Sequence, residues 1–114
     1  MAIHDPLVPG RVRTARRALG SKAKLALYLG VGRSRPGRWE RGEDVPAEGV
    51  LRQIQDLDDV WSRAQRVWAQ PVAREWLPSS NSMLKDASPL TVLKMEGPAP
   101  LIAALDAACA GSCA

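Results

Sequence analysis

Arginine side chains dominate the segment whose chemistry is easiest to read. RSRPGRWERG, residues 33–42, holds four of them: Arg33, Arg35, Arg38 and Arg41. A guanidinium group stays charged at physiological pH and donates paired hydrogen bonds, which suits it to phosphate groups and to the edge of guanine. Pro36 and Gly37 stand in the middle of the same segment, and both residue types disfavour a helix interior. The segment is therefore either a basic loop or a short helix that meets a polyanion.

The net charge of +4 hides an uneven distribution along the chain. Residues 1–42 contain ten lysines and arginines against Asp5 and Glu40, a balance of +8. The chain from Glu43 onward contains six against ten acidic residues, a balance of −4. A basic half is expected of a polyanion binder, and an acidic half more readily meets protein. Drift in surface charge is the competing explanation.

Residue groupings typical of a catalytic or metal site are missing from the sequence. The single histidine is His4, and no Gly-rich loop precedes a Lys-Ser/Thr pair. Cys109 and Cys113 lie four residues apart on a predicted helix, but two ligands alone are too few for zinc. We therefore expect no enzymatic activity, no metal and no cofactor.

The cysteines and the N-terminal segment indicate the compartment. Both cysteines lie within the last six residues, where a disulfide cannot staple a core, so they are typical of reduced thiols. MAIHDPLVPG has no apolar signal-peptide region, and no apolar run approaches the roughly 20 residues of a membrane span. The prediction is a cytoplasmic protein that does not enter a membrane.

Helical signals recur along the whole chain, and no run alternates apolar and polar residues between hairpin turns. We predict an all-α fold, with Gly20, Gly30 and Gly97 ending helices. The predicted helices are residues 12–19; 22–29, with Ser21 as N-cap; a short one within 33–42; a long one with Pro46 in its first turn, reaching Trp68; 72–77; 89–95; and 99–111.

The long helix carries a wide apolar stripe at three- and four-residue spacing. Its members are Leu51 or Ile54, Leu57, Val60, Trp61, Ala64, Val67 and Trp68. Trp61 and Trp68 lie two turns apart on this stripe, and we expect them to pack in a core. An exposed interface is the alternative.

Residues 25–42, LALYLGVGRSRPGRWERG, have the spacing of a helix-turn-helix. Ala26 is small enough for a second helix to cross closely, and Gly30 tolerates the positive φ of a turn. Val31 and Trp39 are the apolar residues that would anchor the second helix.

This stretch resembles the Xre family of repressor-type helix-turn-helix proteins, and LALYLGV and RWERG carry the match. Pro36 replaces the β-branched anchor usual in that family. A cap at Gly32 or Arg33 would put Pro36 in the first turn, where a proline costs little. Gly37 still weakens the helix by roughly 0.5 to 1 kcal/mol relative to alanine. We expect a marginal recognition helix that becomes firm on DNA or within an assembly.

The resemblance implies roles for the polar residues of this region. The start of the recognition helix would face base edges, through Arg33, Ser34 and Arg38. Cations around it would meet phosphates: Arg35, Arg41 and Lys22, together with Lys24, Arg16 and Arg17. An ordinary solvated side chain is the alternative at each position.

The second half of the chain resembles the toxin-binding domain of the Xre/MbcA/ParS antitoxins. The matching segments are WAQPVAREWL and SSNSMLKDASPLTVLKMEGPAPLIAALDAA. The positions that follow the family pattern are Ala73, Trp76, Leu77, Asn81, Leu84, Pro89, Leu90, Leu93, Glu96, Gly97 and Leu105. Ser80 and Thr91 depart from it, where proline and aspartate are common. A small core formed by Trp76 and Leu77 with Leu90, Leu93 and Leu101 is the alternative reading of this pattern.

The combined resemblance implies an antitoxin with a helix-turn-helix in residues 1–45 and a helical toxin-binding domain in residues 46–114. Its partner would be a RES-domain toxin that degrades NAD, blocked sterically by residues 107–114 as a plug and by a docking face around residues 93–105. The implied toxin-binding residues are Trp76, Leu93, Met95, Leu101, Asp106, Cys109, Ser112, Cys113 and Ala114.

Operator DNA would be the second partner, and the protein would repress its own operon, as a dimer within a larger toxin–antitoxin hetero-oligomer. The alternative function is a plain helix-turn-helix repressor whose acidic half dimerises or binds another ligand.

Overall fold

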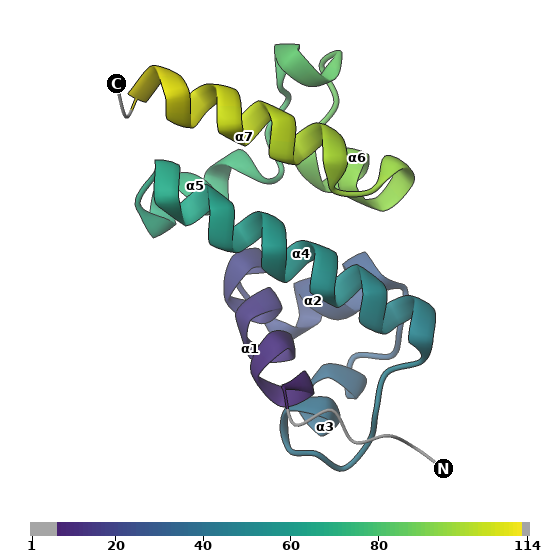
Figure 1. The fold of residues 1–114 in the computed structure, drawn as a ribbon. Coiled ribbons are helices and arrows are strands. Elements are labelled where there is room, and N and C mark those ends of the chain that lie inside the picture. The colour runs from purple at the N-terminus through teal and green to yellow at the C-terminus, as the bar shows by residue number, and fades with distance from the viewer. Residues whose placement is uncertain (1–6, 113–114) are drawn as a thin grey trace. The chain divides into compact units, whose positions relative to one another are not determined.

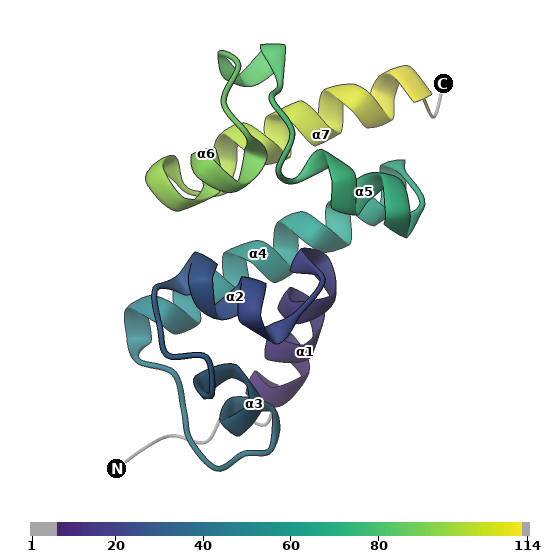
Figure 2. The same ribbon diagram turned by 180° about the vertical axis from the view of Figure 1, so that it is seen from behind.

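The computed structural model describes residues 7–112, without the side chains of Met83 and Ser112. Within this range every regular element is helical, and the backbone pairing outside helices is an isolated bridge between Asn81 and Ala87 (Figures 1 and 2). The elements are α1 (Val8–Leu19), α2 (Lys22–Leu29), α3 (Arg35–Glu40), α4 (Glu48–Val67), α5 (Gln70–Trp76), the 3-10 helix η1 (Ser82–Leu84), α6 (Pro89–Glu96) and α7 (Ala99–Ser112). The predicted all-α class is confirmed for the part of the chain described.

α1 begins four residues earlier than predicted, at Val8. Pro9 stands in its first turn, where backbone N–H groups have no helical partner, so the proline does not oppose the helix. The predicted end is correct: Gly20 has a φ of +104° and donates its N–H to the carbonyl of Arg16.

α2 has the caps that the sequence predicted. The Ser21 hydroxyl accepts the N–H of Lys24 at 3.1 Å, which satisfies one of the free donors of the first turn. Gly30 ends the helix with a φ of +72°, in the left-handed region that side chains disfavour. Five residues, 30–34, in turn conformations or without regular structure separate α2 from α3.

α3 is six residues long and begins after Ser34, so the predicted caps Gly32 and Arg33 are wrong. Pro36 lies in the first turn as predicted, and it is buried. The later start keeps proline within the turn whose N–H groups need no partner, and it shortens the helix to little more than one turn.

α4 begins at Glu48, so the prediction of Pro46 in its first turn is wrong. Residues 44–47 have no regular structure; the Asp44 carboxylate accepts the N–H of Val45 at 2.8 Å, and Pro46 is buried. The carbonyl of Ala47 then accepts the N–H of Leu51. The helix ends at Val67, one residue before the predicted Trp68.

The chain divides into two compact units between Asp58 and Asp59, inside α4. In the first unit α1, α2 and α3 pack against one another in all three pairs. Their fully covered side chains include Val12, Leu25 and Trp39, and Ile54 and Leu57 of α4 are also buried. The sequence placed a boundary at 45/46, before α4.

The second unit contains α6 packed against α7, with η1 also in contact with α7 (Figure 1). Pro71 lies in the first turn of α5, so this helix begins earlier than the predicted residue 72. Ser88 caps α6 through the N–H of Thr91, and Gly97 ends it at a φ of +87°. The side chains buried in this unit include Val60, Trp61, Ala64, Ala73, Leu77, Leu84, Val92, Leu93, Leu101, Ala104 and Leu105.

Candidate functional site

The exposed polar residues around α3 form the first candidate surface. Arg33, Ser34 and Arg38 are all exposed; the first two lie just before α3, and Arg38 lies in its last turn. Trp39 is turned inward and is 1% exposed, as the predicted apolar anchor of this helix would be. Val31 is only half-buried. The three predicted base-facing residues are therefore free to touch a ligand while α3 is held from below.

Three of the predicted phosphate contacts, Arg35, Arg41 and Arg16, already have carboxylate partners. Arg35 lies 3.1 Å from Asp44, and its guanidinium sits over the Trp39 ring at 5.5 Å from the centroid. The Val45 N–H, with Arg35 nearby, lowers the pKa of Asp44 below its ordinary value. This pairing holds Arg35 near the protein surface.

Arg41 pairs with Glu43 through one edge of its guanidinium group. Its Nε and Nη2 donate to the two carboxylate oxygens at 3.0 and 3.1 Å. These hydrogen bonds lower the pKa of Glu43 and raise the pKa of Arg41. Both side chains are more than half exposed, so the pair orients Arg41 and adds little stability.

Arg16 forms an ion pair within the fold, which leaves it less available to a ligand. Its Nε and Nη2 donate to Glu40, whose side chain is only 10% exposed, and Arg13 lies 3.7 Å from the same carboxylate. Glu40 was not predicted as a partner of Arg16, because 24 residues separate the two along the chain. Arg17 also has an interaction of its own.

Lys22 and Lys24, at the start of α2, are exposed and form no ion pair within residues 7–112. Next to them Leu27 is 81% exposed and lines a shallow apolar depression with cations at its rim. The remaining residues of this depression are Ala23, Lys24, Ala26, Val31 and Arg33. Leu27 was not among the predicted site residues, although a leucine that follows a buried pair on a short helix points away from the face of that pair.

The second candidate surface follows α6 and α7. Met95 is 77% exposed, Asp106 is exposed with its carboxylate 3.8 Å from Arg63, and Cys109 is half-buried. Leu93 and Leu101 lie in the core of their unit, at 5% and 0% exposure, so they pack the unit and present no surface to a partner. Cys113, Ala114 and the side chain of Ser112 lie outside the described residues.

Trp76 is half-buried, and its ring lies 5.3 Å from that of Trp68 at an interplanar angle of 42°. The N–H of Leu90 donates to the carbonyl of Leu77 at 3.1 Å, which joins the end of α5 to the start of α6. Of the residues in the small core that the sequence offered as an alternative, Leu77, Leu93 and Leu101 are buried, and Trp76 and Leu90 are half-buried. Trp76 serves packing and still offers part of its ring to a ligand.

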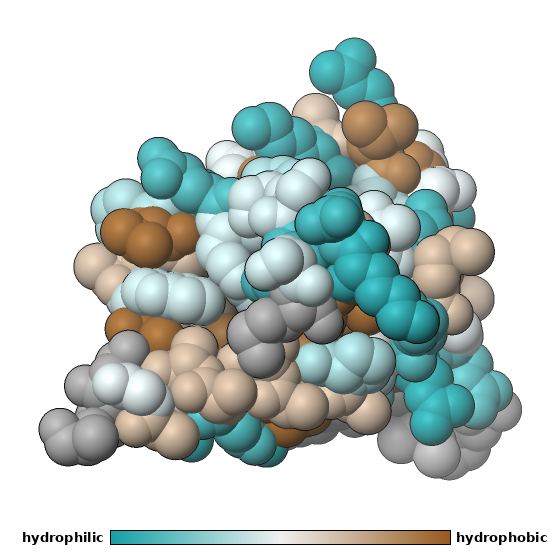
Figure 3. Space-filling model, turned by 90° about the horizontal axis from the view of Figure 1, so that it is seen from above, coloured by the Kyte–Doolittle hydropathy of each residue, from teal (hydrophilic) through white to brown (hydrophobic). Residues whose placement is uncertain are grey.

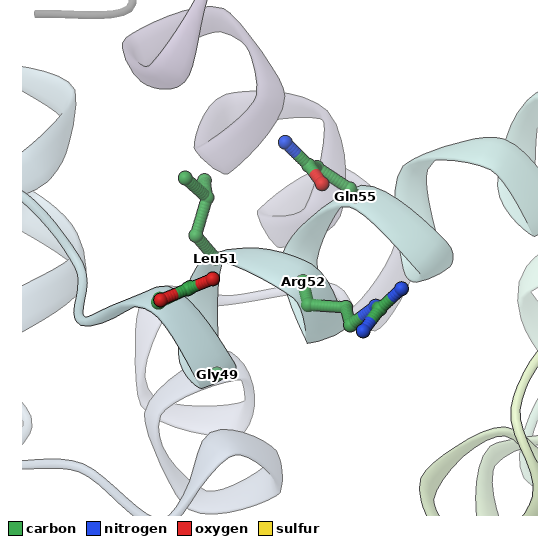
Figure 4. A pocket seen from close by; sticks show the side chains of 5 residues that line it. Gly49, Leu51, Arg52 and Gln55 are labelled. Carbon is green, nitrogen blue, oxygen red and sulfur yellow. The ribbon is translucent and has the colours of Figure 1, made fainter. Parts of the chain in front are cut away.

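Other parts of the surface offer less. Figure 3 shows a face on which apolar side chains form separate patches between hydrophilic ones. Figure 4 shows an open depression along the first turns of α4, lined by Gly49, Leu51, Arg52, Gln55 and Glu48. No three His, Cys, Asp or Glu residues gather as metal ligands in the described range. None of its helices combines the length and hydropathy needed to cross a membrane.

The division into units changes where the negative charge belongs. The balance of −4 predicted for the second half comes entirely from residues 43–58, which hold five acidic residues and Arg52. These residues belong to the first unit. From Asp59 onward five acidic and five basic residues balance. The surface of the second unit is therefore not an acidic one.

The chain matches no family model, no curated protein and no solved structure.

Proposed function

We propose that this protein is an antitoxin that binds operator DNA through α2, the following turn and α3, and that blocks a RES-domain, NAD-degrading toxin through its second unit. The observation that carries the proposal is the order of two motifs on one chain. LALYLGV and RWERG come first, and EWL, SPL and EG follow at the spacing of the Xre/MbcA/ParS antitoxins. Either motif alone is weak, and together they are specific.

The DNA-binding part of the proposal is supported by the difference between the buried and the exposed residues of α3. Trp39 and Pro36 are buried beneath the helix, while Arg33, Ser34 and Arg38 are exposed. Arginine is the commonest bidentate reader of guanine, and residues at the start of a recognition helix reach base edges. Gly30 at a φ of +72° provides the turn between the two helices.

Toxin binding is supported by the exposed residues of the second unit. Met95, with Asp106 and the half-buried Cys109, marks the face of α6 and α7 that a partner can reach. Residues 107–114 act as the plug that obstructs the NAD pocket, so inhibition is steric and this chain performs no chemistry. The buried Leu93 and Leu101 support this face from inside the unit.

Co-purification with a RES-domain toxin tests the antitoxin function. The two proteins are produced together, and we expect them to elute as one complex and cellular NAD to recover to the level without toxin. Met95→Asp should weaken the complex, because it places a charge in an apolar contact. Lys85→Asp, at an exposed position of the 81–87 loop, is the matched control.

Failure of the toxin to co-elute, with NAD still depleted, contradicts the antitoxin function. The plain repressor would then be the better account if the protein still binds a DNA sequence selectively. The burial of Leu93 and Leu101 favours the plain repressor, because packing within the second unit is enough to explain the leucine pattern.

A further inference from the structure

Gly37 occupies a helical position where glycine is disfavoured, and its surroundings show what the missing side chain leaves room for. A Cβ atom built on Gly37 would lie 3.3 Å from Nη1 of Arg41 and 3.6 Å from Nζ of Lys22. The backbone of Gly37 is buried, and its φ is not in the left-handed region. The backbone conformation therefore does not require glycine, whereas the two cations do lie directly over it.

Lys22 and Arg41 come from different parts of the fold and converge on this point. Lys22 is the first residue of α2, and Arg41 follows the last residue of α3. Since both nitrogens lie close to the same point, their separation is within the span of about 8 Å that one phosphate group can bridge with two hydrogen bonds.

Glu43 determines which edge of Arg41 is available. The carboxylate takes Nε and Nη2 of the guanidinium, and Nη1 is the nitrogen left beside Gly37 and Lys22. Glu43 neutralises the charge of Arg41 but not that of Lys22, which forms no ion pair within residues 7–112. Two like charges held close together repel each other, and an anion placed between them removes that repulsion.

We propose that Lys22 and Arg41 bind one and the same phosphate of a nucleic acid backbone, and that Gly37 is the positioning residue that leaves space for it. The inference rests on the DNA-binding part of the proposed function and adds to it a shared contact and a role for a glycine. Glu43 aims the guanidinium. A methyl group at position 37 would take up the space where a phosphate oxygen meets both cations.

Duplex DNA of arbitrary sequence is a sufficient probe, because a backbone contact does not depend on the operator. Fluorescence anisotropy of a labelled duplex, measured across a series of salt concentrations, yields both the affinity and its salt slope. If the two cations share one phosphate, the double variant Lys22→Gln/Arg41→Gln should reduce the magnitude of the salt slope by about 0.9. Its affinity should fall by about five-fold at 0.15 M salt. Two separate phosphates would lower the slope by about 1.8.

Gly37→Ala separates a positioning role from a structural one. Alanine favours the helix, so we expect thermal unfolding to move up by about 2 to 6 °C while DNA affinity falls several-fold. Gly10→Ala in α1 is the matched control, because nothing lies within 4 Å of a Cβ built there. It should raise the unfolding temperature and leave affinity unchanged.

Each outcome is decisive. Unchanged affinity of Gly37→Ala, or a slope change of about 1.8 in the double variant, overturns the shared site while DNA binding itself stands. A protein that binds no duplex even at low salt overturns both this inference and the DNA-binding half of the proposed function. Failure of the toxin to co-elute touches neither result.

Discussion

Single residues in the first unit divide into those that hold the fold and those left for a partner. Arg16 and Glu40 are of the first kind, because three donor–acceptor contacts of 3.0 to 3.3 Å join them. Lys22, Arg33 and Arg38 are of the second kind, since they are exposed. Arg35 and Arg41 lie between, each with a carboxylate at its side.

Replacing Glu40 by glutamine tests the structural kind. The change removes the charge that Arg16 and Arg13 face, and Glu40 is only 10% exposed. Charge-assisted hydrogen bonds of this type are worth about 1.5 to 3 kcal/mol, and the one-third exposure of Arg16 reduces that value. We expect the free energy of unfolding, measured by urea denaturation, to fall by about 1 to 2 kcal/mol.

Arg13→Gln is the matched control, since Arg13 is 46% exposed and lies 3.7 Å from the same carboxylate. Its cost should stay below about 0.5 kcal/mol. Equal losses for the two variants would mean that Glu40 serves the net charge of the region and not the Arg16 contact.

At the scale of elements, the connection between α3 and α4 is an acidic segment folded back on arginines. Glu43 pairs with Arg41, while Asp44 pairs with Arg35 and accepts the N–H of Val45. A phosphate approaching Arg35, or the edge of Arg41 formed by Nε and Nη2, would compete with a carboxylate already in place, whereas Glu43 does not hold Nη1 of Arg41. Lys22, Arg33 and Arg38 are exposed cations with no such carboxylate within residues 7–112.

The pH dependence of stability tests these carboxylate contacts. The pKa values of Glu43 and Asp44 lie below their ordinary values of 4.5 and 3.8, so the folded state favours both charged forms. Their contribution is present above the ordinary values and is lost as pH falls through the lowered ones. We expect the unfolding temperature of the unsubstituted protein to exceed that of Glu43→Gln/Asp44→Asn at pH 6.

The same difference should shrink steadily below pH 4.5, as calorimetry at several pH values would show. Glu43 is 52% and Asp44 30% exposed, so added salt should also reduce it. A difference that stays constant from pH 6 to pH 3 would show that the carboxylates do not contribute through their charge.

At the scale of the whole molecule, the two candidate surfaces belong to different compact units. The residues around α3 lie before the division at Asp58, and those of α6 and α7 lie after it. The first unit carries the positive excess of the chain, and the second is balanced. Attraction to a polyanion would therefore come from the first unit, and the partner proposed for the second unit would have to be recognised mainly by shape and apolar contact.

Substitutions in one unit should leave the binding of the other unit's partner unchanged. Arg33→Ala with Arg38→Ala should lower operator affinity by at least ten-fold, since each lost base contact costs about 1 to 3 kcal/mol, with toxin co-elution unchanged. Met95→Asp should do the reverse. DNA binding by anisotropy and complex formation by gel filtration give both readings on the same samples.

Loss of both functions in Met95→Asp, with an unchanged circular dichroism spectrum, would contradict this independence and point to a coupling of the two units. Loss of both together with the helical signal would identify the variant as unfolded, and Met95→Ser then serves as the milder substitution.

The sequence by itself determined the helical class and the ends of several helices, because these signals are local. Ser21, Gly30, Ser88 and Gly97 act on backbone groups within four residues, and each stands where the structure has a helix end. Proline was harder to place: Pro46 precedes α4 where the sequence put it inside, since a proline suits an extended segment as well as a first turn. The exposed base-facing candidates Arg33, Ser34 and Arg38 were also accessible to sequence reasoning.

Only the tertiary structure decided which residues of a pattern face solvent and which partners distant residues have. Leu93 and Met95 share one short motif, yet Leu93 is buried and Met95 exposed. The packing of α1, α2 and α3 brings Arg16 to Glu40 and places the Lys22 side chain next to Gly37. Such contacts leave no periodic trace in the sequence, because packing brings together side chains whose spacing along the chain is arbitrary.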